Sequence, residues 1–271
     1  MEAPRNTYRC LKLDLVTPVS RLTLDRPEVR NAFDDVLIAE LLDACRELTA
    51  AHEAPGDQGP RALVLTGGGD TFCAGADMNW MRASATHTRD ENEADAHRMA
   101  AMLRALDELP MPTIARVNGA SLGGGMGLLA CCDIVVSVDT AKFGFTEARL
   151  GIAPAVISTF VLPKIGAAAA RRYFLTAEIF GPAEAREMGL VHEVVPSGEL
   201  DPTVDRLVTA LLGNGPRAVS AAKQLIREGL SLPRKESIEN TVRVIAALRA
   251  SPEGQEGLGA FLEKRAPSWK P

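Results

Sequence analysis

The sequence predicts an α/β fold with a core of parallel strands, followed by a helical C-terminal part. Short apolar runs typical of buried strands alternate with helix-like segments between residues 62 and 138. That order is typical of parallel sheets covered by helices. From residue 167 onward the spacing of apolar residues is almost entirely helical. We therefore divide the chain into a core over residues 1–200 and a helical region over residues 201–271.

The first predicted elements are a hairpin and a helix. Leu11–Leu15 and Leu22–Leu24 alternate apolar and polar residues, and a proline-containing break separates them, as in two strands joined by a turn. Residues 34–51 repeat apolar side chains at helical spacing. Asp34 and Asp35 precede them, at the end of a helix where negative charge is favoured.

The middle of the chain alternates between the two kinds of element. Residues 62–66, 113–117 and 134–138 are predicted strands, and residues 99–109 and 126–132 are predicted helices. The polar stretch 83–95 is expected to be irregular. Further helices are predicted over residues 167–176, 183–188, 203–212, 216–229, 238–250 and 255–264.

Composition excludes several classes of protein. The formal net charge of −5 over 271 residues provides no global attraction for nucleic acid or an anionic membrane. No apolar run is long enough to span a membrane, and the first residues do not resemble a secretory signal. An odd number of cysteines without a C-x-x-C pair indicates a reducing compartment. We expect a cytoplasmic chain of enzyme size. The cysteines are Cys10, Cys45, Cys73, Cys131 and Cys132.

Two glycine-rich segments, Phe72–Asp77 and Asn118–Gly127, each follow a predicted strand. Small residues let the backbone approach a ligand, and free N–H groups at a helix start stabilise a developing oxyanion. A tight turn is the simpler alternative for the first segment. The dinucleotide fingerprint is incomplete, because Leu128 stands where its third glycine belongs, and no Gly-Lys-Ser/Thr follows as in a phosphate-binding loop.

Glu147 is the candidate acid or base, because it follows a strand-like run in a mainly apolar setting. Partial burial would raise the pKa of such a carboxyl toward a useful range. The alternative is a surface glutamate paired with Arg149. A metal site is not expected, because the four histidines are scattered. They are His52, His87, His97 and His192.

A nucleophile-elbow pattern lies in the second glycine-rich segment, where Ser121 stands between Gly119 and Gly123. Asp133 or Asp139 and then His192 follow in the chain order of a hydrolase triad. A serine hydrolase is therefore one hypothesis, which depends on a short pattern that glycine-rich loops also produce by chance.

Six groups of residues, in order along nearly the whole chain, resemble the crotonase family, also called the enoyl-CoA hydratase/isomerase superfamily. Each group alone is a weak signal, whereas all of them at the family's spacing are specific. They are Leu24-Asp25-Arg26-Pro27 with Asn31-Ala32, Ala74-Gly75-Ala76-Asp77, Asn118-Gly119 with Gly123-Gly124-Gly125, Cys132-Asp133, Phe143-Gly144 with Glu147 and Leu150-Gly151, and Phe261-Leu262-Glu263-Lys264-Arg265.

The resemblance implies a spiral of ββα units with a C-terminal helical region that packs at trimer contacts, and trimers that usually pair into hexamers. It implies an acyl-CoA substrate, an oxyanion hole made by the N–H groups of Ala76 and Gly124, and Glu147 as the acid/base. No cofactor is implied, because CoA is part of the substrate. The implied CoA-binding residues are Val29, Arg30, Ala74, Asp77 and Met78, with Phe261 and Lys264 contributed by a neighbouring subunit.

The chain departs from the family at Gly127, where hydratases commonly have a first glutamate. A similar glycine occurs in bacterial methylglutaconyl-CoA and isohexenylglutaconyl-CoA hydratases of leucine and terpene catabolism. The resemblance thus favours hydration of a branched, carboxylated enoyl-CoA such as 3-methylglutaconyl-CoA, with Glu147 as the sole acid/base. Arg82 and Arg149 are candidates to bind the substrate's carboxylate.

Two further hypotheses stay open beside the hydratase and the hydrolase. A single glutamate also occurs in enoyl-CoA isomerases, which shift a double bond without adding water. Human relatives of the methylglutaconyl subgroup are described as RNA-binding, which the net charge of −5 disfavours here.

Overall fold

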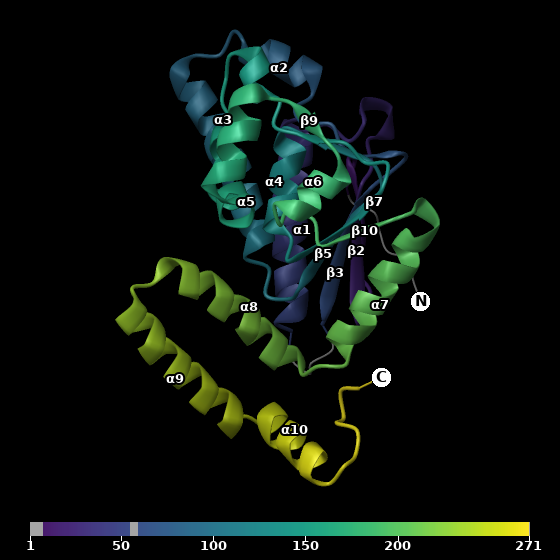
Figure 1. Cartoon of the computed structure of the whole chain (residues 1–271), viewed down its shortest axis with the longest axis vertical. Coiled ribbons are helices and arrows are strands. Elements are labelled where there is room, and N and C mark those ends of the chain that lie inside the picture. Colours follow the sequence, from purple (N-terminus) through teal and green to yellow (C-terminus); the bar gives the residue numbers. More distant parts are fainter. Residues whose placement is uncertain (1–7, 55–58, 271) are drawn as a thin grey trace.

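The computed structural model of the protein describes residues 8–54 and 59–270. Two β-sheets form the centre, with helices packed around them (Figure 1). The larger sheet contains, in spatial order, β1 (Leu11–Asp14), β2 (Val19–Leu24), β3 (Ala62–Gly67), β5 (Thr113–Val117), β7 (Ile134–Val138) and β10 (Glu193–Val195).

The larger sheet is parallel except at one edge. β1 and β2 form an antiparallel hairpin, and β2, β3, β5, β7 and β10 run parallel. Every residue of β3 is buried, which explains why its sequence is a continuous apolar run rather than an alternating one. The predicted α/β class, hairpin and parallel core are therefore confirmed.

A second, smaller sheet contains β4 (Thr71–Cys73), β6 (Ala120–Leu122), β8 (Phe143–Gly144) and β9 (Ile179–Phe180). Of these strands the sequence indicated only β8, as the strand-like run before Glu147; the others have two or three residues each and show no period. β4, β6 and β8 are parallel neighbours. Their carboxyl ends therefore lie at the same edge of this sheet, which brings together the segments that follow them.

Helices α1 (Asp35–His52), α3 (Arg89–Asp107), α4 (Gly124–Cys131) and α5 (Ala155–Thr176) pack on one another in that order. α4 is the central one, since nearly all of its residues are buried. α5 is kinked at Gly166, whose φ of 70° is not helical. Shorter elements are η1 (Pro27–Val29), α2 (Met78–Ser84), η2 (Glu147–Leu150), α6 (Pro182–Glu187) and η3 (Ser197–Glu199).

The expectation of an irregular stretch over residues 83–95 is wrong, because most of these residues are helical. α2 ends at Ser84 and α3 begins at Arg89. Thr88 and Glu91 form a capping box, in which each side chain accepts a hydrogen bond from the other residue's backbone N–H. Such capping satisfies the unpaired N–H groups of a helix start. Because this stretch has few apolar residues, it shows no helical periodicity from which a helix could be predicted.

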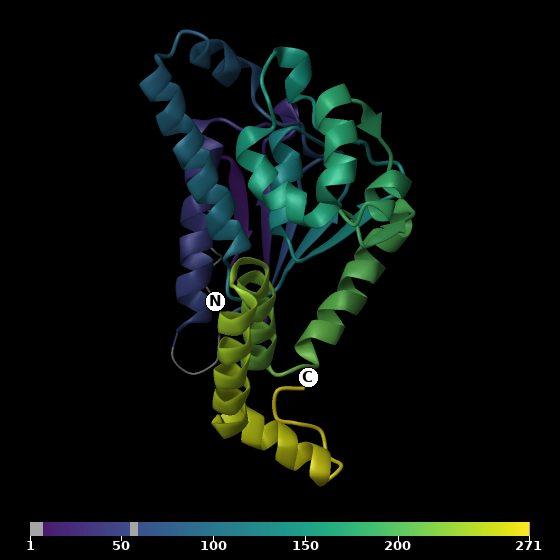
Figure 2. The same ribbon diagram turned by 60° about the vertical axis from the view of Figure 1, so that its left-hand side comes forward.

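The C-terminal helices separate into two groups. α7 (Leu200–Leu212) packs against β3, β5 and β7. α8 (Pro216–Ser231), α9 (Arg234–Ala250) and α10 (Pro252–Leu262) extend away from the sheets (Figures 1 and 2). The domain boundary expected at residue 200 thus coincides with the start of α7, whereas the part that leaves the core begins with α8.

Helix α8 is attached to the core through Lys223, whose side chain is 8% exposed. Its ammonium group lies 2.8 Å from a carboxylate oxygen of Asp133 and donates to the carbonyl of Met111. Within the part of the chain that the structure describes, no helix is long and apolar enough to cross a membrane.

Candidate active site

The two glycine-rich segments meet where they leave β4 and β6. A Cβ atom on Gly75 would lie 3.0 Å from the carbonyl oxygen of Leu122, and one on Gly123 would lie 3.8 Å from the Cα of Gly75. Both glycines have positive φ, 93° at Gly75 and 49° at Gly123, a region that other residues rarely adopt. Glycine is therefore required here both for conformation and for the close approach of two backbones.

The N–H groups of Ala76 and Gly124 have no acceptor among the described residues. Ala76 forms a parallel bridge with Phe33, in which the bonding groups are the carbonyl of Gly75 and the N–H of Asp77, each 2.7 Å from its partner. The N–H of Ala76 itself consequently points away from Phe33. Gly124 is the first residue of α4, so its N–H has no acceptor within the helix.

Both residues line a cavity of about 340 Å³, the size of a small-molecule site. A Cβ on Gly124 would lie 3.0 Å from the Cε of Met99 and from the ring of Phe33, so a side chain at this position would obstruct the cavity. The lining is mainly apolar, with Trp80, Ile152 and Ile157 among its larger side chains. Two unpaired N–H groups therefore lie in an apolar cavity, beside the positive end of a helix.

The segment that carries Ala76 is held by an arginine. Asp77 caps α2 by accepting hydrogen bonds from the N–H groups of Asn79 and Trp80. The guanidinium of Arg26 lies 3.1 Å from Asp77 and 2.9 Å from Asp34, which caps α1. Burial favours a raised pKa for Asp77, but these hydrogen bonds and Arg26 outweigh it and hold the pKa below its usual value.

Glu147 is the first residue of η2, directly beyond β8. A Cβ on Gly123 would lie 3.6 Å from its Oε1, so this carboxyl lies beside the junction of the two glycine-rich segments. Burial raises the pKa of Glu147. Its Oε2 is buried and has no hydrogen-bond partner among the described residues. The alternative pairing with Arg149 is not formed, because that guanidinium donates to the carbonyl of Ala177.

Apolar side chains from other helices occupy the place of the family's first glutamate. Gly127 is buried in α4. A Cβ there would lie 2.6 Å from the Cγ2 of Ile157 and 3.3 Å from the Cδ1 of Leu103. Any side chain at position 127 would therefore require these two to move, and apolar groups stand where a second carboxylate would be.

The expected CoA-binding residues lie in several places. The N–H of Ala74 donates to the carbonyl of Arg30, which places Val29 and Arg30 beside the first glycine-rich segment. Met78 is 65% exposed. Of the residues expected around the pantetheine, only Ala74 lines the cavity, whereas the carboxylate of Asp77 is occupied by α2 and Arg26.

Phe261 and Lys264 lie at the other end of the molecule, in and just after α10, far from α2 and α3 (Figure 1). Neither lines the cavity of its own chain. Phe261 is 81% exposed. Their expected contribution to a neighbouring subunit stays a prediction.

The structure does not assemble the hydrolase triad. Ser121 is fully buried in β6. His192 accepts a hydrogen bond from the N–H of Val135, and Asp133 is bound by Thr113 and Lys223. In the described residues no hydrogen bond or ion pair joins the side chains of the four candidates, Ser121, Asp133, Asp139 and His192, so Ser121 has no base to activate it.

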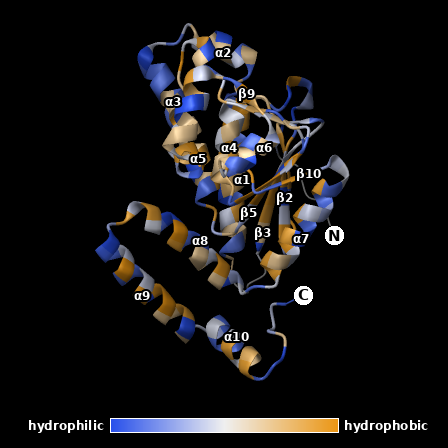
Figure 3. Ribbon diagram, in the orientation of Figure 1, coloured by the Kyte–Doolittle hydropathy of each residue, from blue (hydrophilic) through white to orange (hydrophobic). Residues whose placement is uncertain are grey.

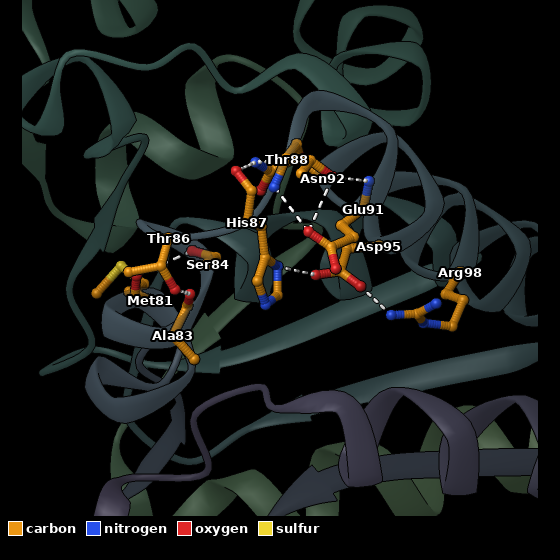
Figure 4. A network of polar contacts seen from close by, with 10 residues as sticks. All are labelled: Met81, Ala83, Ser84, Thr86, His87, Thr88, Glu91, Asn92, Asp95 and Arg98. Atoms are coloured by element: carbon orange, nitrogen blue, oxygen red, sulfur yellow. Dashed lines mark hydrogen bonds and ion pairs between the residues drawn. The ribbon is translucent and has the colours of Figure 1, made fainter.

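A polar group on the cavity wall was not expected from the sequence. Ser84, Asn92 and Asp95 line the cavity from α2 and α3, and Figure 4 shows them with His87 and Arg98. They fall in the stretch that was expected to be irregular. The four-residue spacing of Asp95 and Met99, which puts both on one face of a helix, was the sequence signal that could have placed Asp95 at the cavity. Conversely, neither Arg82 nor Arg149, the candidates for binding a substrate carboxylate, lines the cavity.

Known proteins resemble this chain over nearly its full length. The family described as enoyl-CoA hydratase/isomerase matches residues 16–271. A probable enoyl-CoA hydratase of Rhodobacter capsulatus is 36% identical, over 96% of this chain and 98% of its own. The 2,3-dehydroadipyl-CoA hydratase of Escherichia coli is 33% identical, over 92% and 94%.

Solved structures agree with this match. The crystal structure of an enoyl-CoA hydratase from Shewanella pealeana superposes with a TM-score of 0.90 at 38% identity, covering 97% of each chain. Its likeness confirms the predicted crotonase fold, including the helical C-terminal region. On the strength of the family match, the full-length relatives and the shared fold, this chain belongs to the enoyl-CoA hydratase/isomerase family.

Proposed function

We propose that the protein is an enoyl-CoA hydratase that adds water across the double bond of an acyl-CoA thioester. One arrangement carries the proposal: two unpaired N–H groups, of Ala76 and Gly124, lie beside the buried carboxyl of Glu147 in an apolar cavity. The thioester carbonyl accepts both N–H groups, and Glu147 moves the protons. The family and the relatives' names support the same activity.

The reaction divides between the backbone and one side chain. Hydrogen bonds from Ala76 and Gly124 stabilise negative charge on the thioester oxygen as water attacks the β-carbon, each contributing about 3 kcal/mol in the transition state. Glu147 accepts a proton from the water and delivers one to the α-carbon, so the elements of water are added and no co-reactant is needed. A carboxyl with a raised pKa is suited to both transfers.

The direct test is Glu147→Gln, which keeps the size of the side chain and removes its acid/base chemistry. We expect kcat for hydration of a short enoyl-CoA to fall by about 100-fold or more, measured by the loss of enoyl-thioester absorbance. Glu199→Gln is the matched control, because Glu199 is exposed and remote in η3. Full turnover by Glu147→Gln would contradict the assignment.

For the acyl group, the resemblance favours a branched, carboxylated chain such as 3-methylglutaconyl-CoA, which would place the enzyme in leucine degradation. The name of the Escherichia coli relative also specifies a carboxylated acyl group. However, no Lys or Arg of residues 8–54 and 59–270 lines the cavity to bind such a carboxylate, so the resemblance and the lining of the cavity favour different acyl groups. A panel of enoyl-CoAs, with products identified by mass, tests this assignment, and failure to turn over 3-methylglutaconyl-CoA would remove it.

An enoyl-CoA isomerase is the second candidate, favoured by the apolar packing at Gly127. Ile157 and Leu103 occupy the place of a second carboxylate, and double-bond migration needs only one group to move a proton. Reaction of a 3-enoyl-CoA in ¹⁸O-labelled water discriminates between the two. An isomerase yields the 2-enoyl-CoA without label, whereas a hydratase without isomerase activity leaves the 3-enoyl-CoA unchanged and incorporates oxygen from water only into a 2-enoyl-CoA.

We also propose that the chain assembles as a homotrimer, which can pair into a hexamer. The helices that leave the core carry apolar residues along their length (Figure 3). Several of these have large, exposed side chains, which is unusual for a monomer's surface. They are Ile226, Leu230, Ile238, Val242, Ile245, Leu258, Phe261 and Leu262. In such an assembly Phe261 and Lys264 contact CoA bound to the next subunit.

A further inference from the structure

The part of the cavity wall that α2 and α3 form carries a cluster of polar side chains. Ser84, Asn92 and Asp95 line the cavity there. Asp95 is 8% exposed, and its buried Oδ2 is ion-paired with His87 although it accepts no hydrogen bond of good geometry among the described residues. Figure 4 shows the imidazole of His87 on one side of this carboxylate, with Nδ1 3.3 Å from Oδ2, and Arg98 bound to the other oxygen.

Helix α3 connects these polar side chains to Gly124, beside which the thioester carbonyl is proposed to bind. Met99 touches Gly124, since a Cβ on Gly124 would lie 3.0 Å from the Met99 Cε. Asp95 is four residues earlier on the same face, and Asn92 is seven residues earlier. At the rise of an α-helix, Asp95 lies about 6 Å beyond Met99. A six-carbon acyl chain with its carbonyl at Gly124 is therefore a suitable length for probing this wall.

The donors of these residues are already used within the protein. The hydroxyl of Ser84 donates to the carbonyl of Met81. The amide nitrogen of Asn92 donates to the carbonyls of His87 and Thr88, which fixes the orientation of the amide. What remains for a ligand is three acceptors: the Ser84 hydroxyl oxygen, the Asn92 carbonyl oxygen and the Asp95 carboxylate.

We propose that this all-acceptor wall selects acyl chains whose far end carries a hydrogen-bond donor, such as a hydroxyl or an amide N–H, and discriminates against chains that end in a carboxylate. The proposal rests on the proposed function, because it assigns the substrate class of the same cavity. A hydroxyl donates to these acceptors. A carboxylate brings acceptor against acceptor. No Lys or Arg in the described cavity wall compensates its charge, and the guanidinium of Arg98 is already paired with Asp95.

The test compares three substrates of equal length: hex-2-enoyl-CoA, 6-hydroxyhex-2-enoyl-CoA and hex-2-enedioyl-CoA, which ends in a carboxylate. For the wild-type enzyme we expect kcat/KM for the hydroxylated substrate to exceed that for the carboxylated one by at least about tenfold. Asp95→Asn introduces an amide donor at the same size, and should narrow that ratio several-fold. Equal turnover of the two substrates by the wild-type enzyme would overturn the proposal.

Asp90→Asn is the matched control, because it makes the same change on α3 at an exposed position outside the cavity. It should leave the ratio unchanged. An equal narrowing in Asp90→Asn and Asp95→Asn would reduce the effect to general charge and contradict a specific contact.

Binding separates failure of this proposal from failure of the proposed function. Hexanoyl-CoA, 6-hydroxyhexanoyl-CoA and adipoyl-CoA have no double bond, so calorimetry measures their affinities without turnover. If hex-2-enoyl-CoA is not hydrated but 6-hydroxyhexanoyl-CoA binds at least about tenfold more tightly than adipoyl-CoA, the cavity wall is selective and the proposed hydratase activity is contradicted. If hydration proceeds and the two affinities are equal, the reaction stands and the selectivity is refuted.

Discussion

At the scale of single residues, the site depends on what surrounds Glu147. Its Oε2 is buried without a partner among the described residues, and burial raises its pKa above the ordinary value of 4.5. The charged form is therefore disfavoured in the folded protein relative to the unfolded chain. A group poised in this way costs stability at neutral pH, and is typical of catalytic carboxyls.

The pH dependence of stability follows from that shift. Below the unfolded pKa both states are protonated, and Glu147 contributes nothing. As the pH rises from about 4.5 through the raised folded pKa, the unfolded chain loses its proton first, so the wild-type protein loses stability relative to Glu147→Gln. Urea unfolding of both proteins at a series of pH values from 4 to 8 measures this difference. A constant difference across the series would contradict burial as the cause.

Gly127 and Ile157 form a coupled pair, because a Cβ at position 127 would lie 2.6 Å from the Ile157 Cγ2. We expect Gly127→Ala to destabilise the protein by about 1–3 kcal/mol through overpacking, although alanine is favoured over glycine in helices. Ile157→Ala destabilises the protein by itself, because it removes a buried side chain, but Gly127→Ala should cost less stability in the Ile157→Ala background than in the wild type. A double-mutant cycle by urea unfolding measures the coupling, and additive effects would show that the two positions are independent.

At the scale of elements, Arg26 joins the starts of two helices to the first glycine-rich segment. Its guanidinium contacts Asp34 and Asp77, the caps of α1 and α2, and also the carbonyl of Ala32. All three ionised side chains are less than 20% exposed. The arrangement holds the backbone beside Ala76, whose N–H is one of the two donors proposed for the thioester carbonyl.

We expect Arg26→Met to destabilise the protein by about 3 kcal/mol, because two largely buried carboxylates lose their cation. The KM for an enoyl-CoA should rise as well, since the loop is held less firmly. Arg46→Met is the control: its pair with Asp43 is more than half exposed on both sides, so about 1 kcal/mol or less is expected. Equal losses in the two variants, measured by denaturant unfolding, would show that Arg26 has no special structural role.

At the scale of the whole molecule, the helices beyond the core have no counterpart to cover them among the described residues of one chain. α8, α9 and α10 project from the sheets (Figure 2) and carry apolar side chains on their exposed faces. Association with further copies removes this surface from water, at roughly 25 cal/mol per Å² of apolar area.

Phe261→Asp tests the assembly and its link to the substrate together. Phe261 is 81% exposed in the single chain, so the charge should not disturb folding. We expect a lower molar mass by light scattering at low protein concentration, and a KM raised several-fold if Phe261 contacts CoA of the next subunit. Ser231→Asp, at the exposed end of α8, is the control. A trimer with unchanged KM in Phe261→Asp would remove the proposed contact with CoA.

Local patterns along the chain determined the larger elements of this molecule. Alternation over residues 11–24, the buried apolar runs and the helical periods all depend on neighbours a few positions apart. They correctly indicated the hairpin, the parallel strands and most of the helices. The motif spacing also placed Ala76, Gly124 and Glu147 in the segments that meet, because family resemblance carries information about distant contacts.

Other features depended on residues far apart in the sequence, and only the tertiary structure decided them. The two- and three-residue strands of the smaller sheet exist because they pair with one another. Ile157 fills the space beside Gly127, and Asp95 faces the same cavity as Glu147, although no sequence period links these positions. The sequence by itself therefore determined the fold class and the candidate groups. Packing decided which side chains surround them, because contact energies act through space and not along the chain.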